Sequence, residues 1–171
     1  MLRLRHARVI DPASGHDGVA DVWVDNGCIA AVGRAPRGAG KAREIDLAGQ
    51  VLCPGFADPG SHLREPGYEH KATIASEARA AAAGGFTTVC CTPDTQPVLD
   101  NPSVIEHITQ RAVAAGAAQV VCLGALTVGL NGEVLSEMHA LKAAGCVGVT
   151  NLGRAIKDTA VLKHALAYAA S

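Results

Sequence analysis

The chain of 171 residues is 49% hydrophobic and carries a formal net charge of −1 at pH 7. Its length and apolar content allow one packed domain, or one domain with a small appendage, and exclude a disordered tail. The pI is near 6.6 and no dense Lys/Arg run is present, which argues against nucleic acid or an anionic membrane as partner. We therefore expect a small molecule or a protein as ligand.

The N-terminal residues and the cysteines indicate the compartment. The opening stretch, MLRLRHARVIDP, alternates apolar residues with Arg and His, which the apolar region of a signal peptide would not tolerate. No apolar run reaches the roughly 18 residues of a membrane span. Six cysteines lie mostly in apolar stretches without CxxC pairs, and we expect them to be buried, reduced thiols: Cys28, Cys53, Cys90, Cys91, Cys122 and Cys146. These features predict a cytoplasmic protein without a membrane partner.

Residues 1–53 predict a small β-sandwich-like module. A strand is expected up to Ile10, followed by a turn in DPASG. The stretch VADVWVDNGCIAAVG predicts two strands joined at Asn26-Gly27, the dipeptide that favours a tight hairpin. After a Gly/Pro-rich connector, EIDLAGQVLC predicts two more short strands.

From Pro54 to Ser171 strands and helices alternate, which is typical of a parallel sheet. Strands are expected in GFAD, FTTVCC, QVVCLGAL and CVGVT. The helix in TIASEARAAAA should end at Gly84-Gly85, and Asn101 should cap the next helix, with Pro102 opening it. That second helix should bury Val104, Ile105, Ile108 and Ala112; the third should use Leu135, Met138 and Leu141; the fourth should begin near Asp158 and present Val161, Leu162, Ala165, Leu166 and Ala169.

Residues 54–171 thus supply four strand-helix units, whereas a closed (β/α) barrel has eight. An open four-stranded sheet is one endpoint, but its first and last strands would expose apolar edges. We expect an α/β chain in which the β module precedes the first four units of a truncated or interrupted TIM-type (β/α)8 barrel. A fragment of a longer chain, without independent function, is the other interpretation.

The stretch ADPGSHLREPGYEH, residues 57–70, raises the question of chemistry. If 58–64 is extended, the side chains at 58, 60, 62 and 64 point to one face. Asp58, His62 and Arg64 are functional residue types, and the fourth position is Gly60. The strand therefore looks like a metal-binding strand with one ligand missing.

At DPGSHLREPG, with AAAAGGFTTVCCTPDTQPVLDNP behind it, the chain resembles the dihydroorotases of the amidohydrolase superfamily. The resemblance covers the whole chain but only about the first two fifths of a family member. It implies a (β/α) barrel with zinc at its C-terminal mouth, and a reaction of pyrimidine synthesis that interconverts carbamoyl aspartate and dihydroorotate. Hydantoinases and allantoinases share this architecture.

The family pattern Asp-x-His-x-His-x-Arg is matched by Asp58, His62 and Arg64, but Gly60 stands at the first His. Glycine has no ligand atom, so zinc binding should be severely weakened, and His62 is left as a vestigial metal ligand or as an ordinary hydrogen-bonded histidine. The resemblance gives Arg64 the role of holding the substrate carboxylate, for which a planar cation is suited. The alternative is an Arg64 paired with Glu65 or another neighbour.

Two further stretches of the sequence depart from the family. In TPDT, Asp94 stands where the family usually has an Asn that meets the substrate carboxylate, so repulsion is expected unless Asp94 is a plain turn or cap residue. After the fourth barrel strand, Asn151 and Leu152 replace an Asp-Asp pair that contributes to the metal site. The resemblance places the remaining ligands, two histidines and a general-base Asp, beyond residue 171.

These departures affect three separate chemical roles, while the scaffold pattern is retained. The resemblance therefore implies a non-catalytic dihydroorotase-like subunit that supports aspartate transcarbamoylase assembly, with the transcarbamoylase catalytic chain as partner and an oligomeric state. No cofactor is expected, except zinc if the family activity is retained. The alternative is an active zinc-dependent dihydroorotase, or a related cyclic-amide hydrolase, completed by another polypeptide. The other histidines show no ligand spacing: His6, His16, His70, His107, His139 and His164.

Overall fold

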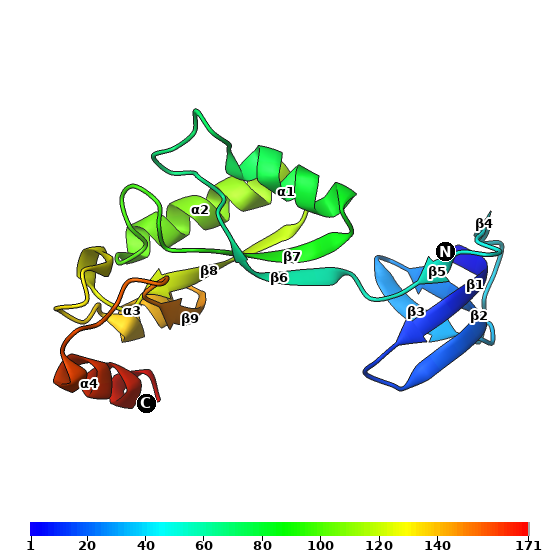
Figure 1. Cartoon of the computed structure of the whole chain (residues 1–171). Helices are drawn as coiled ribbons and strands as arrows, with labels where there is room; N and C mark the ends of the chain where they lie inside the picture. Colours follow the sequence, from blue (N-terminus) through cyan, green and yellow to red (C-terminus); the bar gives the residue numbers. More distant parts are fainter. Residues whose placement is uncertain (171) are drawn as a thin grey trace. The chain divides into compact units, whose positions relative to one another are not determined.

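The structure, a computed structural model, describes residues 1–170. The chain divides into two compact units, Met1–Pro54 and Gly55–Ser171. Each unit has its own sheet, as the labels in Figure 1 show. The two units are described separately below.

The N-terminal unit is a five-stranded sheet. Its strands are β1 (Leu2–Asp11), β2 (His16–Asp25), β3 (Cys28–Val32), β4 (Arg43–Asp46) and β5 (Val51–Leu52). The strand order is β3-β2-β1-β4, and β5 also pairs with β1. The predicted hairpin is present, because both Asn26 (φ 48°) and Gly27 (φ 78°) adopt the left-handed conformation that a tight two-residue turn requires. Ala7, Val9 and Val22 form its buried centre.

The second unit is a four-stranded parallel sheet with helices between the strands. Its strands are β6 (Phe56–Ser61), β7 (Phe86–Cys91), β8 (Gln119–Ala125) and β9 (Cys146–Thr150), paired in the order β6-β7-β8-β9. Its helices are α1 (Ile74–Ala83), α2 (Pro102–Ala115), α3 (Met138–Ala143) and α4 (Thr159–Ala169), with a short 3-10 turn at Val128–Leu130. Figure 1 shows α1 and α2 over the same face of the sheet.

Local sequence signals account for where the first two helices begin and end. Thr73 caps α1, its hydroxyl accepting a hydrogen bond from the Ser76 N–H, and Gly84 ends the helix. Asn101 caps α2 and Pro102 occupies its first turn, as predicted. The four residues predicted to face the core from α2 are all buried: Val104, Ile105, Ile108 and Ala112.

The core of the second unit lies between the sheet and its helices. Val89 and Cys91 of β7 and Cys122 of β8 pack there against Ile105 and Ile108 of α2. Leu63, just after β6, belongs to the same cluster and is 2% exposed. The loop that follows β6 is therefore anchored in the core, which fixes the residues on either side of Leu63.

Two details of the predicted secondary structure and burial were wrong. Leu135 precedes α3 and pairs with Thr127 in an isolated bridge instead of joining the helix. Cys28 and Cys53 are exposed, because both lie in the small N-terminal unit, whose buried centre is only a few residues wide.

Helix α4 begins where it was predicted, with Asp158 as its N-cap. Its apolar face is largely uncovered by the described chain, with Leu166 64% exposed and only Ala165 buried.

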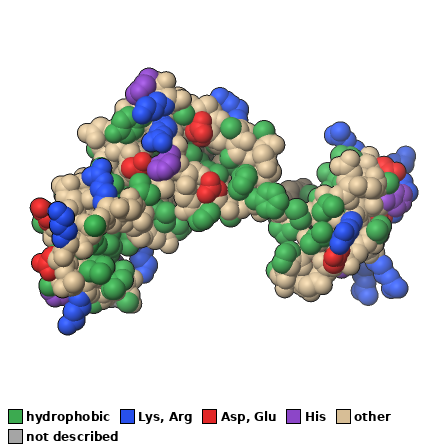
Figure 2. All heavy atoms as spheres, viewed as in Figure 1, with side chains coloured by type: hydrophobic (Ala, Val, Ile, Leu, Met, Phe, Trp, Pro, Cys, Tyr) green, Lys and Arg blue, Asp and Glu red, His purple; other side chains and the backbone are tan. Residues whose placement is uncertain are grey.

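The surface carries both signs of charge. Figure 2 shows Lys/Arg and Asp/Glu side chains interspersed on the visible face of the second unit. No helix within residues 1–170 is both long and apolar enough to cross a membrane.

Candidate functional site

The predicted site residues lie at the carboxyl edge of the parallel sheet. His62 and Arg64 follow β6, Asp94 follows β7, and Asn151 follows β9. Carboxyl ends of parallel strands meet at one edge, which is where barrel enzymes carry their functional groups. The sequence order alone therefore brings these four side chains to the same edge of the sheet.

The first of these strands covers only part of the 58–64 stretch that was considered as extended. β6 ends at Ser61, and Arg64 has φ 66°, so residues 58–64 are not extended throughout. The Asp58 carboxylate accepts hydrogen bonds from the Gly60 N–H (3.0 Å) and the Ser61 hydroxyl (2.6 Å). The Ser61 hydroxyl, and then the Gly60 N–H, lower the pKa of Asp58. Asp58 thus turns the chain instead of pointing along a common face with His62 and Arg64.

His62 forms a compact group with Asp94 and Thr92. Its Nδ1 lies 2.8 Å from Asp94 Oδ2 and 3.1 Å from Thr92 Oγ1. The Thr92 hydroxyl donates to the other Asp94 oxygen at 2.6 Å. A neutral His62 that donates from Nδ1 to the carboxylate keeps its lone pair on Nε2, and the side chain is 45% exposed.

The environment of Asp94 favours its ionised form. Burial by itself raises the pKa of Asp94, but the hydrogen bonds from Thr92 and His62 outweigh it and hold that pKa below its usual range. Arg64 Nη1 lies 3.7 Å from Asp94 Oδ2. Asp94 is therefore an anion that already has a histidine, a hydroxyl and a guanidinium around it, which is more than a plain turn residue has.

Arg64 does not pair with Glu65, which was one predicted alternative. Glu65 is 4% exposed and accepts hydrogen bonds from the Ile74 N–H (2.7 Å) and from Arg111 Nε (2.8 Å). It therefore joins the first turn of α1 to α2, immediately next to Arg64. This buried carboxylate fixes the backbone from which the Arg64 side chain extends.

The loops after β6 and β7 are also in direct contact. The Gln96 N–H donates to the Pro66 carbonyl at 3.0 Å. Gly67 has φ 96°, and a Cβ atom at this position would overlap the Gln96 backbone and side chain. Only glycine fits here, so the glycine of LREPG has a packing reason.

A second polar group lies at the ends of β8 and β9. The Thr127 hydroxyl donates to Asn151 Oδ1 at 2.7 Å, and Asn151 Nδ2 donates to the Arg154 carbonyl at 3.0 Å. The Gly132 N–H donates in turn to the Thr127 hydroxyl at 2.9 Å. Asn151 is 9% exposed and Thr127 is fully buried. Asn151 therefore uses both ends of its amide to hold two loops together, and Leu152 beside it offers no polar atom.

The described residues do not by themselves fit a catalytic zinc site. Within residues 1–170 no group of three His, Cys, Asp or Glu side chains is placed to hold a metal ion. Gly60 contributes no donor, both oxygens of Asp58 accept local hydrogen bonds, and the Asn151 amide is engaged. At this edge of the described chain, His62 Nε2 has no hydrogen-bond partner and keeps a lone pair of the type that binds a metal.

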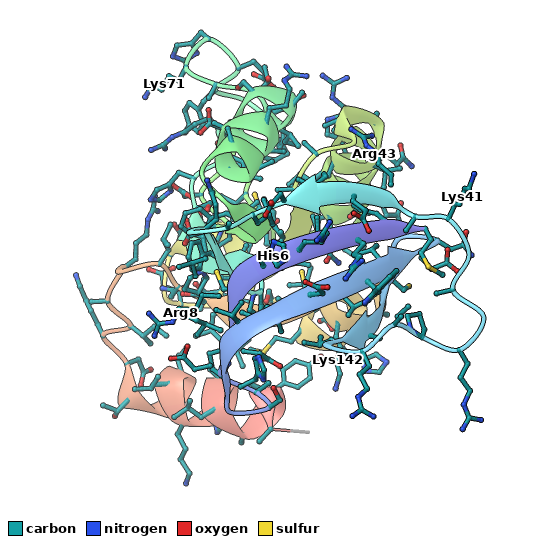
Figure 3. The ribbon with its side chains drawn as sticks, turned by 90° about the vertical axis from the view of Figure 1, so that its right-hand side faces the viewer. His6, Arg8, Lys41, Arg43, Lys71 and Lys142 are labelled. Atoms are coloured by element: carbon teal, nitrogen blue, oxygen red, sulfur yellow. The ribbon has the colours of Figure 1, made fainter. Side chains whose placement is uncertain are left out.

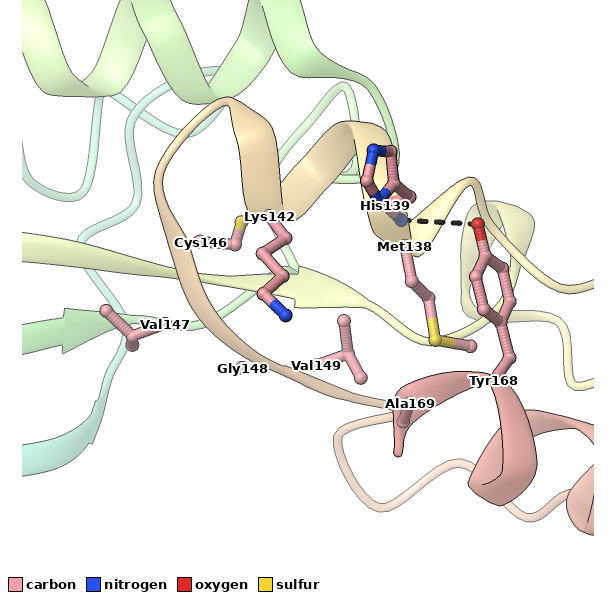
Figure 4. Close-up of a pocket in the computed structure, with 9 residues that line it drawn as sticks. All are labelled: Met138, His139, Lys142, Cys146, Val147, Gly148, Val149, Tyr168 and Ala169. Atoms are coloured by element: carbon pink, nitrogen blue, oxygen red, sulfur yellow. Dashed lines mark hydrogen bonds between the residues drawn. The ribbon is translucent and has the colours of Figure 1, made fainter. Parts of the chain in front are cut away.

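A separate cleft of about 400 Å³ lies between α3, β9 and α4. Figure 4 shows Met138 and Tyr168 lining it, with the His139 N–H donating to the Tyr168 hydroxyl at 3.3 Å. None of the predicted site residues lines this cleft. It therefore belongs to the packing of α4. It is distinct from the carboxyl edge of the sheet that carries His62, Arg64, Asp94 and Asn151, called the polar edge below.

The sequence reasoning missed Thr92 and Thr127, and it considered Glu65 only as a partner of Arg64. Thr92 and Thr127 each follow a predicted strand, and polar residues directly after buried parallel strands are a usable signal. Glu65 has no such signal, because its partner Arg111 is 46 residues away.

The comparisons with known proteins agree on the family. The model of the family described as dihydro-orotase-like matches residues 49–171. The chain is 49% identical over 170 residues to a dihydroorotase-like protein of Pseudomonas aeruginosa, covering 99% of this chain and 40% of that protein. It is 42% identical over 169 residues to a dihydroorotase of Trichlorobacter lovleyi, again covering 99% of this chain and 40% of the relative. The chain thus spans about two fifths of the length of these relatives.

Solved structures confirm the predicted fold class. An L-hydantoinase of Arthrobacter aurescens superposes with a TM-score of 0.67 at 24% identity, covering 86% of this chain and 32% of the enzyme. An N-acyl-D-glutamate deacylase of Bordetella bronchiseptica superposes with a TM-score of 0.61 at 19% identity, covering 95% of this chain and 41% of that protein. These likenesses concern the fold: a small β module and a parallel, curled half-barrel sheet. The matched family model, which covers residues 49–171, shows that the chain belongs to the dihydro-orotase-like family.

Proposed function

We propose that this chain is part of a non-catalytic dihydroorotase-like protein of pyrimidine biosynthesis that supports the assembly of aspartate transcarbamoylase. The family is established by the sequence match, whereas the loss of catalysis and the partner are the proposal. Such a role requires a folded scaffold with a binding surface and does not require a metal site.

The observation that carries this proposal is the pair of hydrogen bonds made by the Asn151 side chain. The resemblance assigns this position to an Asp of the metal site. Here the amide accepts a buried hydrogen bond from the Thr127 hydroxyl and donates a partly buried one to the Arg154 carbonyl. A carboxylate cannot donate to a carbonyl, so an ionised Asp would leave the Arg154 carbonyl unpaired and repelled. The position is adapted to holding loops together.

Gly60 supports the same proposal, because the fold would accommodate a larger residue at this position. A Cβ added there would meet only the Thr92 methyl group, at 3.9 Å, and the backbone of Gly60 is not left-handed. Neither space nor backbone conformation therefore demands a glycine. The fold therefore does not require the absence of a histidine at position 60.

The proposal is tested by mixing the chain with the aspartate transcarbamoylase catalytic chain and measuring complex formation by light scattering coupled to size exclusion. We expect a defined complex and an unchanged elution after EDTA treatment. A matched control is the Gly60→His variant, which should bind the transcarbamoylase equally well. Loss of the complex on metal removal would contradict a metal-independent scaffold.

One observation favours a second candidate, an active zinc-dependent cyclic-amide hydrolase completed by another polypeptide. The Asp94 carboxylate beside His62 Nδ1 leaves Nε2 unbonded within residues 1–170, and a carboxylate on the distal nitrogen is the usual support of a metal-ligating histidine. Zinc titration separates the candidates. Under the scaffold proposal the wild type binds zinc weakly and Gly60→His, which restores a His-x-His pair, binds it at least about tenfold more tightly. Tight zinc binding by the wild type that His62→Gln abolishes would favour the hydrolase.

A further inference from the structure

The loop that joins β3 to β4 carries an unusual concentration of unpaired positive charge. Between Asp25 and Glu44 the sequence contains no acidic residue. The same stretch contains four cations, all exposed: Arg34, Arg37, Lys41 and Arg43. We call residues 33–43, which comprise this loop and the first residue of β4, the basic loop.

The other arginines of the N-terminal unit are all neutralised. Arg3 lies 2.6 Å from Asp21, Arg5 lies 2.8 Å from Glu44, and Arg8 lies 2.7 Å from Asp17. The carboxylates of Asp17, Asp21 and Glu44 are therefore already paired with these three arginines. Within residues 1–170 no hydrogen bond or ion pair engages the side chain of any of the four cations of the basic loop.

The basic loop is attached to the sheet at both ends. The Gly33 N–H donates to the Asp21 carbonyl at 2.8 Å, and the Arg43 N–H donates to the Met1 carbonyl at 3.1 Å. A turn between them is closed by the Ala39 N–H and the Pro36 carbonyl at 3.1 Å. Figure 3 shows Lys41 extending from the outer side of this loop, away from the sheet. Backbone hydrogen bonds therefore hold the loop from which the four exposed cations extend.

Exposed apolar side chains adjoin the loop. Val32, directly before it, is 48% exposed, and Ile29 on the same edge strand is 70% exposed. Apolar side chains bordered by Arg are typical of protein interfaces. Nucleic acid fits less well, because the one aromatic residue of this unit, Trp23, is 7% exposed and offers no ring for base stacking.

We propose that the basic loop, together with Ile29 and Val32, is a docking surface for an acidic protein surface with an apolar centre. The inference rests on the proposed function, which supplies the partner used as probe. Opposite charges on the partner would steer the encounter and set its orientation, while the two apolar side chains would be buried on contact. Binding should weaken as the ionic strength rises.

The test compares two variants with the same change in charge. In the loop variant, Arg34, Arg37, Lys41 and Arg43 are all replaced by Gln. In the control, four exposed cations of the second unit are replaced by Gln: Lys142, Arg154, Lys157 and Lys163. The dissociation constant for the aspartate transcarbamoylase catalytic chain is measured by biolayer interferometry at low and high salt. Circular dichroism checks that both variants are folded.

The loop variant should bind at least about tenfold more weakly, with most of the salt dependence lost, while the control keeps wild-type affinity. If the wild type binds and the loop variant binds equally well, this inference is overturned and the proposed function stands. Equal weakening by both variants also overturns it, because net charge would then suffice. If the wild type does not bind the transcarbamoylase at all, the proposed function fails, and the inference fails with it. Binding of a DNA oligonucleotide through the loop, without binding of the transcarbamoylase, would assign the loop to nucleic acid and overturn the proposal.

Discussion

The hydroxyl of Thr127 donates a 2.7 Å hydrogen bond to Oδ1 of Asn151, across the ends of β8 and β9. Because the Asn151 amide donates from its other end to the Arg154 carbonyl, the side chain joins the loop after β8 to the loop after β9. The same position would carry a metal-site carboxylate in a dihydroorotase of the pattern that this chain resembles. In this chain the Asn151 side chain therefore has a structural role.

Replacing Asn151 by Asp should destabilise the fold by about 1–3 kcal/mol at neutral pH, since the partly buried hydrogen bond to the Arg154 carbonyl loses its donor. Burial and the facing carbonyl should raise the pKa of the new carboxyl above its unfolded value of about 3.9. The loss is therefore small at low pH, where the protonated carboxyl can donate, and it grows as the pH rises through the folded pKa. Urea unfolding at several pH values measures it. Asn131→Asp, at an exposed position in the same loop region, should change stability little, and an equal effect of the two variants would contradict the assignment.

Glu65→Gln should destabilise the second unit by about 2 kcal/mol. The Glu65 carboxylate serves two donors, the Ile74 N–H and Arg111 Nε, and the amide of Gln has one oxygen to offer. Thermal unfolding gives the measurement, and Glu106→Gln, an exposed change on α2, serves as control with an expected effect within about 0.5 kcal/mol. An effect of Glu65→Gln no larger than that of the control would show that the buried pair does not hold α1 to α2.

Asp94 should contribute pH-dependent stability. Its pKa in the folded chain lies below the usual value, so its ionised form is favoured by folding. The contribution is fully present above the unfolded value of about 3.9 and is lost as the pH falls through the lower folded pKa. The stability difference between wild type and Asp94→Asn should therefore shrink on acidification below about pH 4. A pH-independent difference for Asp94→Asn would contradict the hydrogen bonds that Asp94 accepts from Thr92 and His62.

The six cysteines should differ in reactivity. Burial raises the pKa of Cys122 to about 12 and that of Cys146 to about 11, and it raises the pKa of Cys91 still further. Cys28 and Cys53 are exposed. Iodoacetamide at mildly alkaline pH should label Cys28 and Cys53 first, because alkylation requires an accessible thiolate. Mass spectrometry of the native and the urea-unfolded protein should show labelling of Cys91 and Cys122 only after unfolding; rapid native labelling of either would contradict the packing of the core.

Much of the fold was predictable because its signals are local. The cap at Asn101, the Pro102 that follows it and the apolar spacing of α2 together define that helix, and the structure confirms all three. The hairpin at Asn26-Gly27 is equally local. The alternation of strands and helices then gave the parallel sheet, which places His62, Asp94 and Asn151 at one edge.

The remaining features depend on contacts that no local pattern encodes. Periodicity alone extends the strand from Asp58 to Arg64, but the Asp58 carboxylate turns the chain at Ser61 and Arg64 becomes left-handed. Glu65 bonds to Arg111, which is 46 positions away along the chain. Thr127 bonds to Asn151, which is 24 positions away. Sequence reasoning could place Asn151 at the edge of the sheet, but only the fold shows what its amide holds.

The most direct test of the scaffold account is the zinc content and dihydroorotate turnover of the native protein that contains these 171 residues, measured on one sample purified without chelators. The account predicts substoichiometric zinc and no turnover above that of the buffer, in a protein that still forms a complex with aspartate transcarbamoylase. Stoichiometric zinc together with turnover that His62→Gln abolishes would contradict it, and would show that the polar edge is a working metal centre.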